Sequence, residues 1–265
     1  LRAMRAHKSD ARLRAKTALQ QQEQCLRAKM APTVHKATTV WSVLLMAYMA
    51  CLMHWRDTDV ARRFFEGCRI IGRVPRTRLF RPMRAAPPLP RDEYLQANDV
   101  AKYEAKCRAT EDTAEIHDTL QVEAGDGFAL PPQPPAYYNK VYGPYGWRAV
   151  VRWIYVQPSG KRRPIDDAKW GDQNAATQVL EKLHCLSIDF PAVAIKCLFQ
   201  MIADFFPHLW EQVPVQETQP VLGLDDQKDA YRGCPVHPED LCASLIAYRD
   251  KNTADLKVRQ MVTLM

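Results

Sequence analysis

β-Branched and aromatic residues dominate residues 147–156 (WRAVVRWIYV), and this pattern predicts a β-strand. The sequence Pro-Ser-Gly at 158–160 is typical of a turn. Residues 161–167 (KRRPIDD) are therefore predicted to return as the second strand of a hairpin. Apolar runs at 241–248 and 256–264 predict two further strands.

One helix and one buried strand are predicted between the hairpin and these later strands. The helix begins near Asp189, and its apolar positions repeat every four residues at Ala194, Leu198, Ile202 and Phe206. Residues 221–224 (VLGL) predict a strand that ends at Asp225 and Asp226. Because strands and helices both occur here, we expect residues 147–265 to form an α+β body.

The start of the chain is predicted to be helical. Residues 1–30 contain no Gly or Pro and are rich in Ala, Leu, Arg and Gln. Residues 37–55 contain no Asp, Glu, Lys or Arg, which predicts an apolar helix. We interpret it as a buried core helix; a transmembrane helix is the alternative, since about 17–25 residues cross a bilayer. A further helix is predicted over 58–67, with Asp57 or Thr58 as its cap.

Composition divides the chain into three parts. Residues 1–84 form a basic helical region, and residues 147–265 form the α+β body. The pieces at 85–90 (AAPPLP) and 131–146 are rich in proline and lie on either side of a charged run. Residues 85–146 are therefore predicted to be a connecting arm.

Charge and cysteine content narrow the range of partners. The net charge of +7 is unevenly spread, because residues 1–84 carry +13 and the remaining residues carry −6. A basic first third suits nucleic acid or an anionic membrane, and a solvated helical face is the alternative. The eight cysteines show no CxxC pair and no zinc spacing. Reduced thiols indicate an intracellular protein, in the nucleus or cytoplasm, with membrane association as the alternative.

Residues 224–236 (LDDQKDAYRGCPV) carry the most specific chemistry. An apolar strand that ends in a carboxylate holds that group rigidly, and Asp226 could bind a hard cation such as Mg²⁺ through oxygen. Tyr231 follows Asp226 by five residues, so its ring could lie beneath an incoming sugar. A strand-to-loop turn with a solvated aspartate is the alternative.

The pattern Asp-x-x-Asp-Ala-Tyr-x-x-x-Pro resembles the first catalytic motif of retroviral and retrotransposon reverse transcriptases. The resemblance implies that Asp226 and the backbone of Gln227 are metal ligands for Mg²⁺. It also implies that Asp229 and Ala230 contact the triphosphate and that Tyr231 is the steric gate.

Residues 157–177 resemble the fingers hairpin of the same enzymes. Lys161 and Arg163 are the candidates for triphosphate contacts because cations suit phosphate oxygens, and Arg162 is the alternative. The turn after the second strand would be ordered by Asp166, Asp167 and Asn174. A run of basic residues by itself is usually only surface charge.

Residues 67–82 and 146–167 together look like the region before the fingers in polymerases of tyrosine-recombinase retrotransposons. The resemblance extends over about residues 60–82 and 146–265. It implies a partial polymerase fingers and palm body preceded by the basic helical region. Its partners would be RNA or DNA.

No Phe/Tyr-x-Asp-Asp sequence occurs in the chain, so the second carboxylate set of a two-metal polymerase site is missing. We therefore expect a truncated reverse-transcriptase-like protein of the RNA-directed DNA polymerase family that is inactive as this chain. The alternative is a non-catalytic structural or membrane-associated subunit of a larger protein complex, with residues 37–55 at the membrane.

Overall fold

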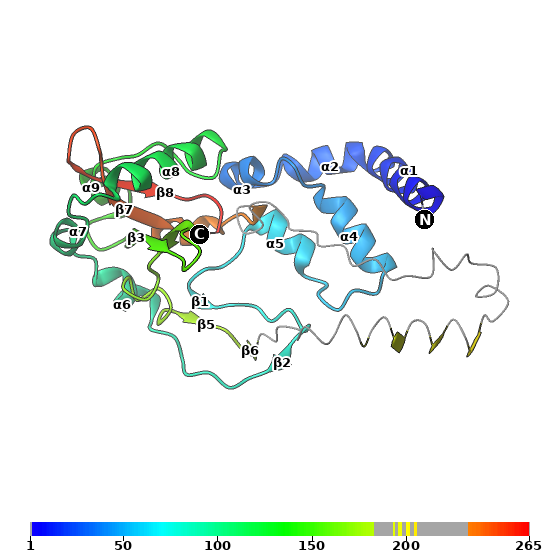
Figure 1. Ribbon diagram of the computed structural model, residues 1–265. Helices are drawn as coiled ribbons and strands as arrows, with labels where there is room; N and C mark the ends of the chain where they lie inside the picture. Colours follow the sequence, from blue (N-terminus) through cyan, green and yellow to red (C-terminus); the bar gives the residue numbers. More distant parts are fainter. Residues whose placement is uncertain are drawn as a thin grey trace. The chain divides into compact units, whose positions relative to one another are not determined.

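The computed structural model describes residues 2–182 and 233–264 and, between them, positions 193, 196–197, 200–201 and 204–205 (Figure 1). The chain divides into two compact units, one of Leu1–Lys182 with Asp229–Met265 and one of Leu183–Lys228. Helices and mixed sheets together make an α+β fold, as predicted. In the second unit the described positions are helical. The elements described below belong to the first unit.

A four-stranded sheet in the order β4-β3-β7-β8 forms the centre of this unit. Its strands are β3 (Ala149–Val156), β4 (Arg162–Asp166), β7 (Leu245–Arg249) and β8 (Leu256–Gln260). Strand β3 pairs with β4 in antiparallel and with β7 in parallel orientation, and β7 pairs with β8 in antiparallel orientation. The predicted hairpin and both later strands are confirmed.

Successive side chains of a strand point to opposite faces of the sheet. Helices cover both of these faces. On one face Ala149, Val151, Leu245 and Ala247 share a buried cluster with Tyr94, Tyr103, Tyr138 and Trp147. On the other face Val150, Ile246 and Tyr248 pack with Leu120. The core therefore lies on both sides of β3 and β7.

The segment at 85–146 is more than the predicted connecting arm. It contains α6 (Arg91–Gln96), α7 (Val100–Lys106), α8 (Thr113–Gly125) and α9 (Pro135–Tyr142). Each of these helices buries a large side chain in the core, in order Tyr94, Tyr103, Leu120 and Tyr138. The helices are short and each carries few apolar positions, so their composition is similar to that of a linker.

The first third is helical, with α1 (Arg2–Ala18), α2 (Gln20–Arg27), α3 (Pro32–Ala37), α4 (Val43–Leu52) and α5 (Val60–Glu66). The prediction of one apolar helix over 37–55 is wrong in extent. Ser42 interrupts it, because its side chain accepts a hydrogen bond from the Leu45 N–H and begins α4 there. The described helices include none that is long and apolar enough to cross a membrane.

The interpretation of this stretch as a buried core helix holds only for the first half of α4. Within α4 only Val43 and Leu45 are buried. Leu52 at its end and Met53 just beyond it are 58% and 64% exposed. The apolar sequence therefore forms a helix whose first half packs against a core cluster and whose end is exposed.

The predicted cap of the next helix is wrong as well. Helix α5 begins after Asp59, whose side chain makes no capping hydrogen bond. Asp57 instead forms an ion pair with Arg63, inside the helix that it was expected to cap. An ion pair with a guanidinium can stabilise a carboxylate more than a hydrogen bond from a backbone N–H does. Asp57 therefore pairs with Arg63 and does not cap the helix.

Two short strand pairs hold the basic segment at 72–82 against the chain that follows the hairpin. Strand β1 (Gly72–Arg73) pairs in parallel with β5 (Thr177–Gln178), and β2 (Arg81–Pro82) pairs in antiparallel orientation with β6 (Glu181–Lys182). Between the pairs, the Glu181 carboxylate accepts hydrogen bonds from the N–H groups of Thr77 and Arg78, both at 2.6 Å.

Asp240 joins three distant parts of the chain. It lies on the 3₁₀-helix η3 (Pro238–Ala243) and is fully buried. Its carboxylate pairs with Arg69 at 3.0 Å and Arg91 at 2.8 Å, and it accepts a hydrogen bond from the Ile70 N–H at 2.9 Å. One buried carboxylate therefore fixes the positions of the segment after α5, the start of α6 and the segment before β7.

We expect Asp240→Ala to lower the free energy of unfolding by about 3–5 kcal/mol, because it leaves buried donors and cations without their acceptor. Urea denaturation followed by circular dichroism measures the loss. Glu239→Ala is the matched control, because Glu239 is the neighbouring carboxylate and is mostly exposed. Equal losses in the two variants would contradict a structural role for Asp240.

Candidate nucleic-acid interface

The hairpin of β3 and β4 carries the cations that the sequence indicates as phosphate contacts. Its turn is closed by two hydrogen bonds, from the Gln157 N–H to the Lys161 carbonyl at 2.9 Å and from the Gly160 N–H to the Gln157 carbonyl at 2.8 Å. Gly160 has φ +80°, a left-handed conformation that favours glycine. Lys161 lies at the end of this turn, and Arg163 lies on β4.

The pairing register divides the hairpin residues between two faces, since directly opposite residues of an antiparallel pair share a face. Trp153 lies opposite Ile165, and Tyr155 lies opposite Arg163. The residues on the other face are Arg152, Ile154, Val156, Arg162, Pro164 and Asp166.

Buried ion pairs hold the face that carries Arg152. The Arg152 side chain is fully buried and pairs with Glu123 of α8 at 2.9 Å and with Asp166 at 2.7 Å. Burial disfavours its charged form, but the two carboxylates outweigh that effect and raise the pKa of Arg152. The pair with Glu123 therefore fixes the hairpin on α8, and the pair with Asp166 joins β3 to β4.

Arg162 also lies on this face, and its guanidinium is paired with carboxylates. Its guanidinium pairs with Glu115 of α8 at 2.6 Å and with Asp112. Lys161 and Arg163 are exposed, and the structure shows no ion pair between either of them and the residues that it describes. Of the three consecutive cations, Lys161 and Arg163 are therefore the ones available to a ligand, which favours them over Arg162.

The opposite face of the hairpin exposes aromatic side chains beside Arg163. Trp153 and Tyr155 are 44% and 42% exposed, and their ring centroids lie 6.0 Å apart in an edge-on arrangement. Ile165 is exposed on the same face. Aromatic rings with a nearby cation can stack bases and neutralise phosphate at the same time. These two rings are not among the site residues predicted from the sequence, although the alternation in WRAVVRWIYV indicates them.

A small basic cavity adjoins Trp153. Its volume is about 150 Å³, and Lys106, Arg108 and Arg249 are among the residues that line it. Arg249 is paired with Glu104 at 2.7 Å. Its lining also includes residues of the α8 face of the hairpin, so the cavity is not confined to the face with the exposed rings.

The turn after β4 agrees in part with its predicted construction. The Asp167 carboxylate accepts a hydrogen bond from the Trp170 N–H at 2.9 Å, so Asp167 orders the turn. Asn174 contributes through its backbone, whose N–H donates to the Ala168 carbonyl at 3.2 Å. Asp166 also contributes through its backbone, whose carbonyl accepts a hydrogen bond from the Ala168 N–H at 2.9 Å, while its carboxylate pairs with Arg152.

The predicted catalytic and nucleotide residues of the second motif lie outside the described residues. They are Asp226, Gln227, Asp229, Ala230 and Tyr231. Their proximity to Lys161 and Arg163 therefore stays a prediction, as does the Mg²⁺ site at Asp226 and Gln227. The described part of the motif begins at Gly233, and Pro235 forms a bridge with Thr263.

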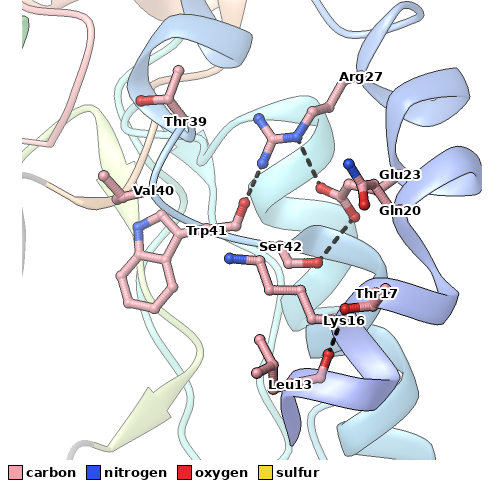
Figure 2. A pocket seen from close by; sticks show the side chains of 10 residues that line it. All are labelled: Leu13, Lys16, Thr17, Gln20, Glu23, Arg27, Thr39, Val40, Trp41 and Ser42. Atoms are coloured by element: carbon pink, nitrogen blue, oxygen red, sulfur yellow. Dashed lines mark hydrogen bonds and ion pairs between the residues drawn. The ribbon is translucent and has the colours of Figure 1, made fainter.

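A second concave site lies in the basic first third, between α1, α2 and the loop before α4 (Figure 2). Its volume is about 340 Å³. The Glu23 carboxylate on its wall accepts hydrogen bonds from the N–H groups of Val43 at 3.0 Å and Leu44 at 2.8 Å, and pairs with Arg27 at 3.0 Å. Glu23 thus occupies the N-terminus of α4, where an anion would otherwise bind.

The described residues include no group of three or more His, Cys, Asp or Glu side chains that could hold a metal ion. No family model, curated protein or solved structure matches the chain. The candidate interface therefore rests on the hairpin geometry itself.

We expect Arg152→Leu to loosen the hairpin, because it removes the buried cation that joins β3 to Glu123 of α8 and to Asp166 of β4. A loss of about 3–5 kcal/mol corresponds to roughly 10²- to 10⁴-fold faster amide exchange in β4. Hydrogen exchange with mass spectrometry measures it. Arg163→Ala, on the exposed face of the same hairpin, is the control and should leave exchange in β4 nearly unchanged. Similar exchange in both variants would show that the buried pairs do not hold the hairpin.

Proposed function

We propose that this chain is a reverse-transcriptase-like protein that binds single-stranded nucleic acid through the exposed face of the β3–β4 hairpin. One observation carries the proposal. Trp153, Tyr155 and Arg163 share that face, and the rings are exposed beside a cation to which the described residues supply no counter-ion. Stacking on such rings contributes about 1–3 kcal/mol per base, and it tolerates any sequence because every base has a π-face.

The sequence resemblance supports the same assignment. The segment that resembles a fingers hairpin forms a hairpin, with Lys161 at its turn and Arg163 on β4. In the proposed role these two cations contact phosphate oxygens of a nucleotide or strand. Asp229, Ala230 and Tyr231 would complete the nucleotide contacts.

The basic first third is proposed as a second electrostatic contact. Arg12 and Lys16 are exposed on α1, and the segment at 72–82 adds further arginines. Phosphate neutralisation does not depend on base sequence and weakens as salt rises. This region would therefore increase affinity without contributing specificity.

Polymerisation by these residues alone is not part of the proposal. Asp226 and the carbonyl of Gln227 would give Mg²⁺ two ligands and leave most of its octahedral shell to water. A two-metal mechanism needs a second set of carboxylates, and the sequence contains no Phe/Tyr-x-Asp-Asp to supply it. The proposed activity is accordingly binding, with weak Mg²⁺ or nucleotide affinity at most.

A second candidate function is that of a structural subunit at an anionic membrane surface. The observation that favours it is the exposed apolar end of α4. Tyr48, Met49, Leu52, Met53 and Trp55 are all more than a third exposed there, and Arg56 follows directly. An apolar surface with adjacent cations can lie in a lipid interface without crossing it.

We expect Trp153→Ala to weaken binding of a single-stranded oligonucleotide by about 5- to 100-fold, because one stacking contact is lost. The dependence of affinity on salt should stay the same in this variant. Arg163→Ala should instead flatten the slope of log affinity against log salt by about 0.7, the value for one phosphate contact on a single strand. Fluorescence anisotropy at several salt concentrations measures both quantities.

Arg162→Ala is the matched control for these two variants, because Arg162 lies on the other face and is held by Glu115. It should bind as the wild type does. Unchanged binding in the Trp153 and Arg163 variants would rule out the hairpin surface. Binding to anionic vesicles in place of oligonucleotides, lost on Leu52→Glu, would favour the membrane function.

We further expect no detectable primer extension by the purified chain with Mg²⁺ and deoxynucleotides. Each 1.36 kcal/mol of lost transition-state stabilisation lowers a rate about tenfold, and the missing metal clamp accounts for several such steps. Robust extension that Asp226→Asn abolishes would contradict this expectation. It would place a second metal site elsewhere in the chain.

A further inference from the structure

Two cysteines that are far apart in the sequence meet where the chain re-enters the described structure. Cys68 forms a parallel bridge with Val236. Its N–H donates to the Pro235 carbonyl at 2.7 Å, and its carbonyl accepts from the His237 N–H at 2.9 Å. Cys234 lies two residues before Val236, the bridge partner of Cys68. The two thiols hydrogen-bond to each other.

The backbone around both thiols is closely packed. Gly67 has φ +96°, and a Cβ at this position would lie 2.5 Å from the His237 Cα, so only glycine permits this approach. On the other side of Cys234, a Cβ on Gly233 would lie 3.1 Å from the Trp41 indole nitrogen. The two glycines therefore permit close packing on either side of the cysteine pair.

Arg63 supplies positive charge beside the pair. One of its terminal nitrogens is bound to Asp57, while Nη1 is buried with no hydrogen-bond partner. The hydrogen bond from Cys68 lowers the pKa of Cys234 to about 7 against the opposing effect of burial, and Arg63 lowers it further. The same hydrogen bond, together with burial, raises the pKa of Cys68. Of the two thiols, Cys234 is therefore the one that ionises first, and Cys68 is the thiol that donates to it.

We infer that Cys68 and Cys234 are a redox-active pair that closes to an intramolecular disulfide by exchange with a low-molecular-weight disulfide such as oxidised glutathione. The Cys234 thiolate attacks one sulfur of glutathione disulfide, forms a mixed disulfide and releases one glutathione thiolate. Cys68 then loses its proton and attacks the Cys234 sulfur. The bond to glutathione breaks, and the second glutathione leaves with that proton. Two protein thiols are oxidised, and one glutathione disulfide is reduced to two thiols.

Both sulfurs can take part, because Cys68 and Cys234 are each partly exposed. The bond would connect the end of α5 to the segment that follows Tyr231 in the polymerase-like motif. It would close a loop that contains β1 to β6, so oxidation restricts the unfolded chain over most of its length. This inference does not depend on nucleic-acid binding.

The test uses the full chain, incubated with oxidised glutathione, alkylated and mapped by mass spectrometry. We expect a peptide pair linked through Cys68 and Cys234, with a mass lower by two hydrogen atoms than the reduced pair. The rate of its formation should rise with pH through about 7. Oxidation should raise Tm by about 5–10 °C, as expected for a disulfide that closes a long loop.

Three variants separate the steps. Cys68→Ser should leave a lasting glutathione adduct on Cys234, and Cys234→Ser should prevent the reaction at Cys68. Cys51→Ser, at an exposed cysteine of α4, is the control and should leave the linked peptide unchanged. Glutathione adducts on Cys51 without a Cys68–Cys234 link in the wild-type chain would overturn the inference. A link from Cys234 to a different cysteine would overturn it as well.

Discussion

The close approach of residues 67–71 to residues 235–240 is the contact on which the rest of the first unit depends. It joins segments about 170 positions apart in the sequence. Gly67 allows the two backbones to meet, and the hydrogen bonds of Cys68 extend that meeting into a bridge. Asp240 then accepts the Ile70 N–H and pairs with Arg69 and Arg91. A buried carboxylate with this many donors tolerates few other arrangements.

The position of the hairpin follows from this contact. Strand β7 begins directly after η3, and the Arg148 N–H donates to the Cys242 carbonyl at 2.9 Å at the start of β3. The two strands run parallel, so they cannot be joined by a tight turn and their register depends on contacts outside the strands. Asp240 fixes the segment before β7, β7 sets the register of β3 by pairing with it, and β3 pairs in turn with β4. The exposed rings and cations are placed by a carboxylate to which they have no direct connection.

The hairpin and the last two strands could be predicted because each is encoded by neighbouring residues. The middle segment could not be predicted in the same way. Tyr94, Tyr103 and Tyr138 lie in short helices, and their burial depends on a sheet formed by residues that come later. The helix at 37–55 was overestimated for a related reason. Hydropathy is continuous across Ser42, whereas helix geometry is broken by one side-chain hydrogen bond.

The candidate site shows the same limit at the level of single residues. Lys161, Arg162 and Arg163 are consecutive and chemically similar, so composition cannot separate them. Strand geometry does, because neighbours in a strand point to opposite faces and the carboxylates of α8 approach only one face.

The exposure of the aromatic rings on the other face of the hairpin also depends on strand geometry. Ala149 and Val151 lie on the face of β3 that carries Trp153 and Tyr155, and they are buried in the core. The described helices therefore cover the first half of that face and leave its aromatic half open. Two neighbouring aromatic side chains left in water lower the stability of the free protein relative to a protein that buries them. A ligand that stacks on them would recover that free energy, whereas a purely structural hairpin gains nothing from keeping them exposed.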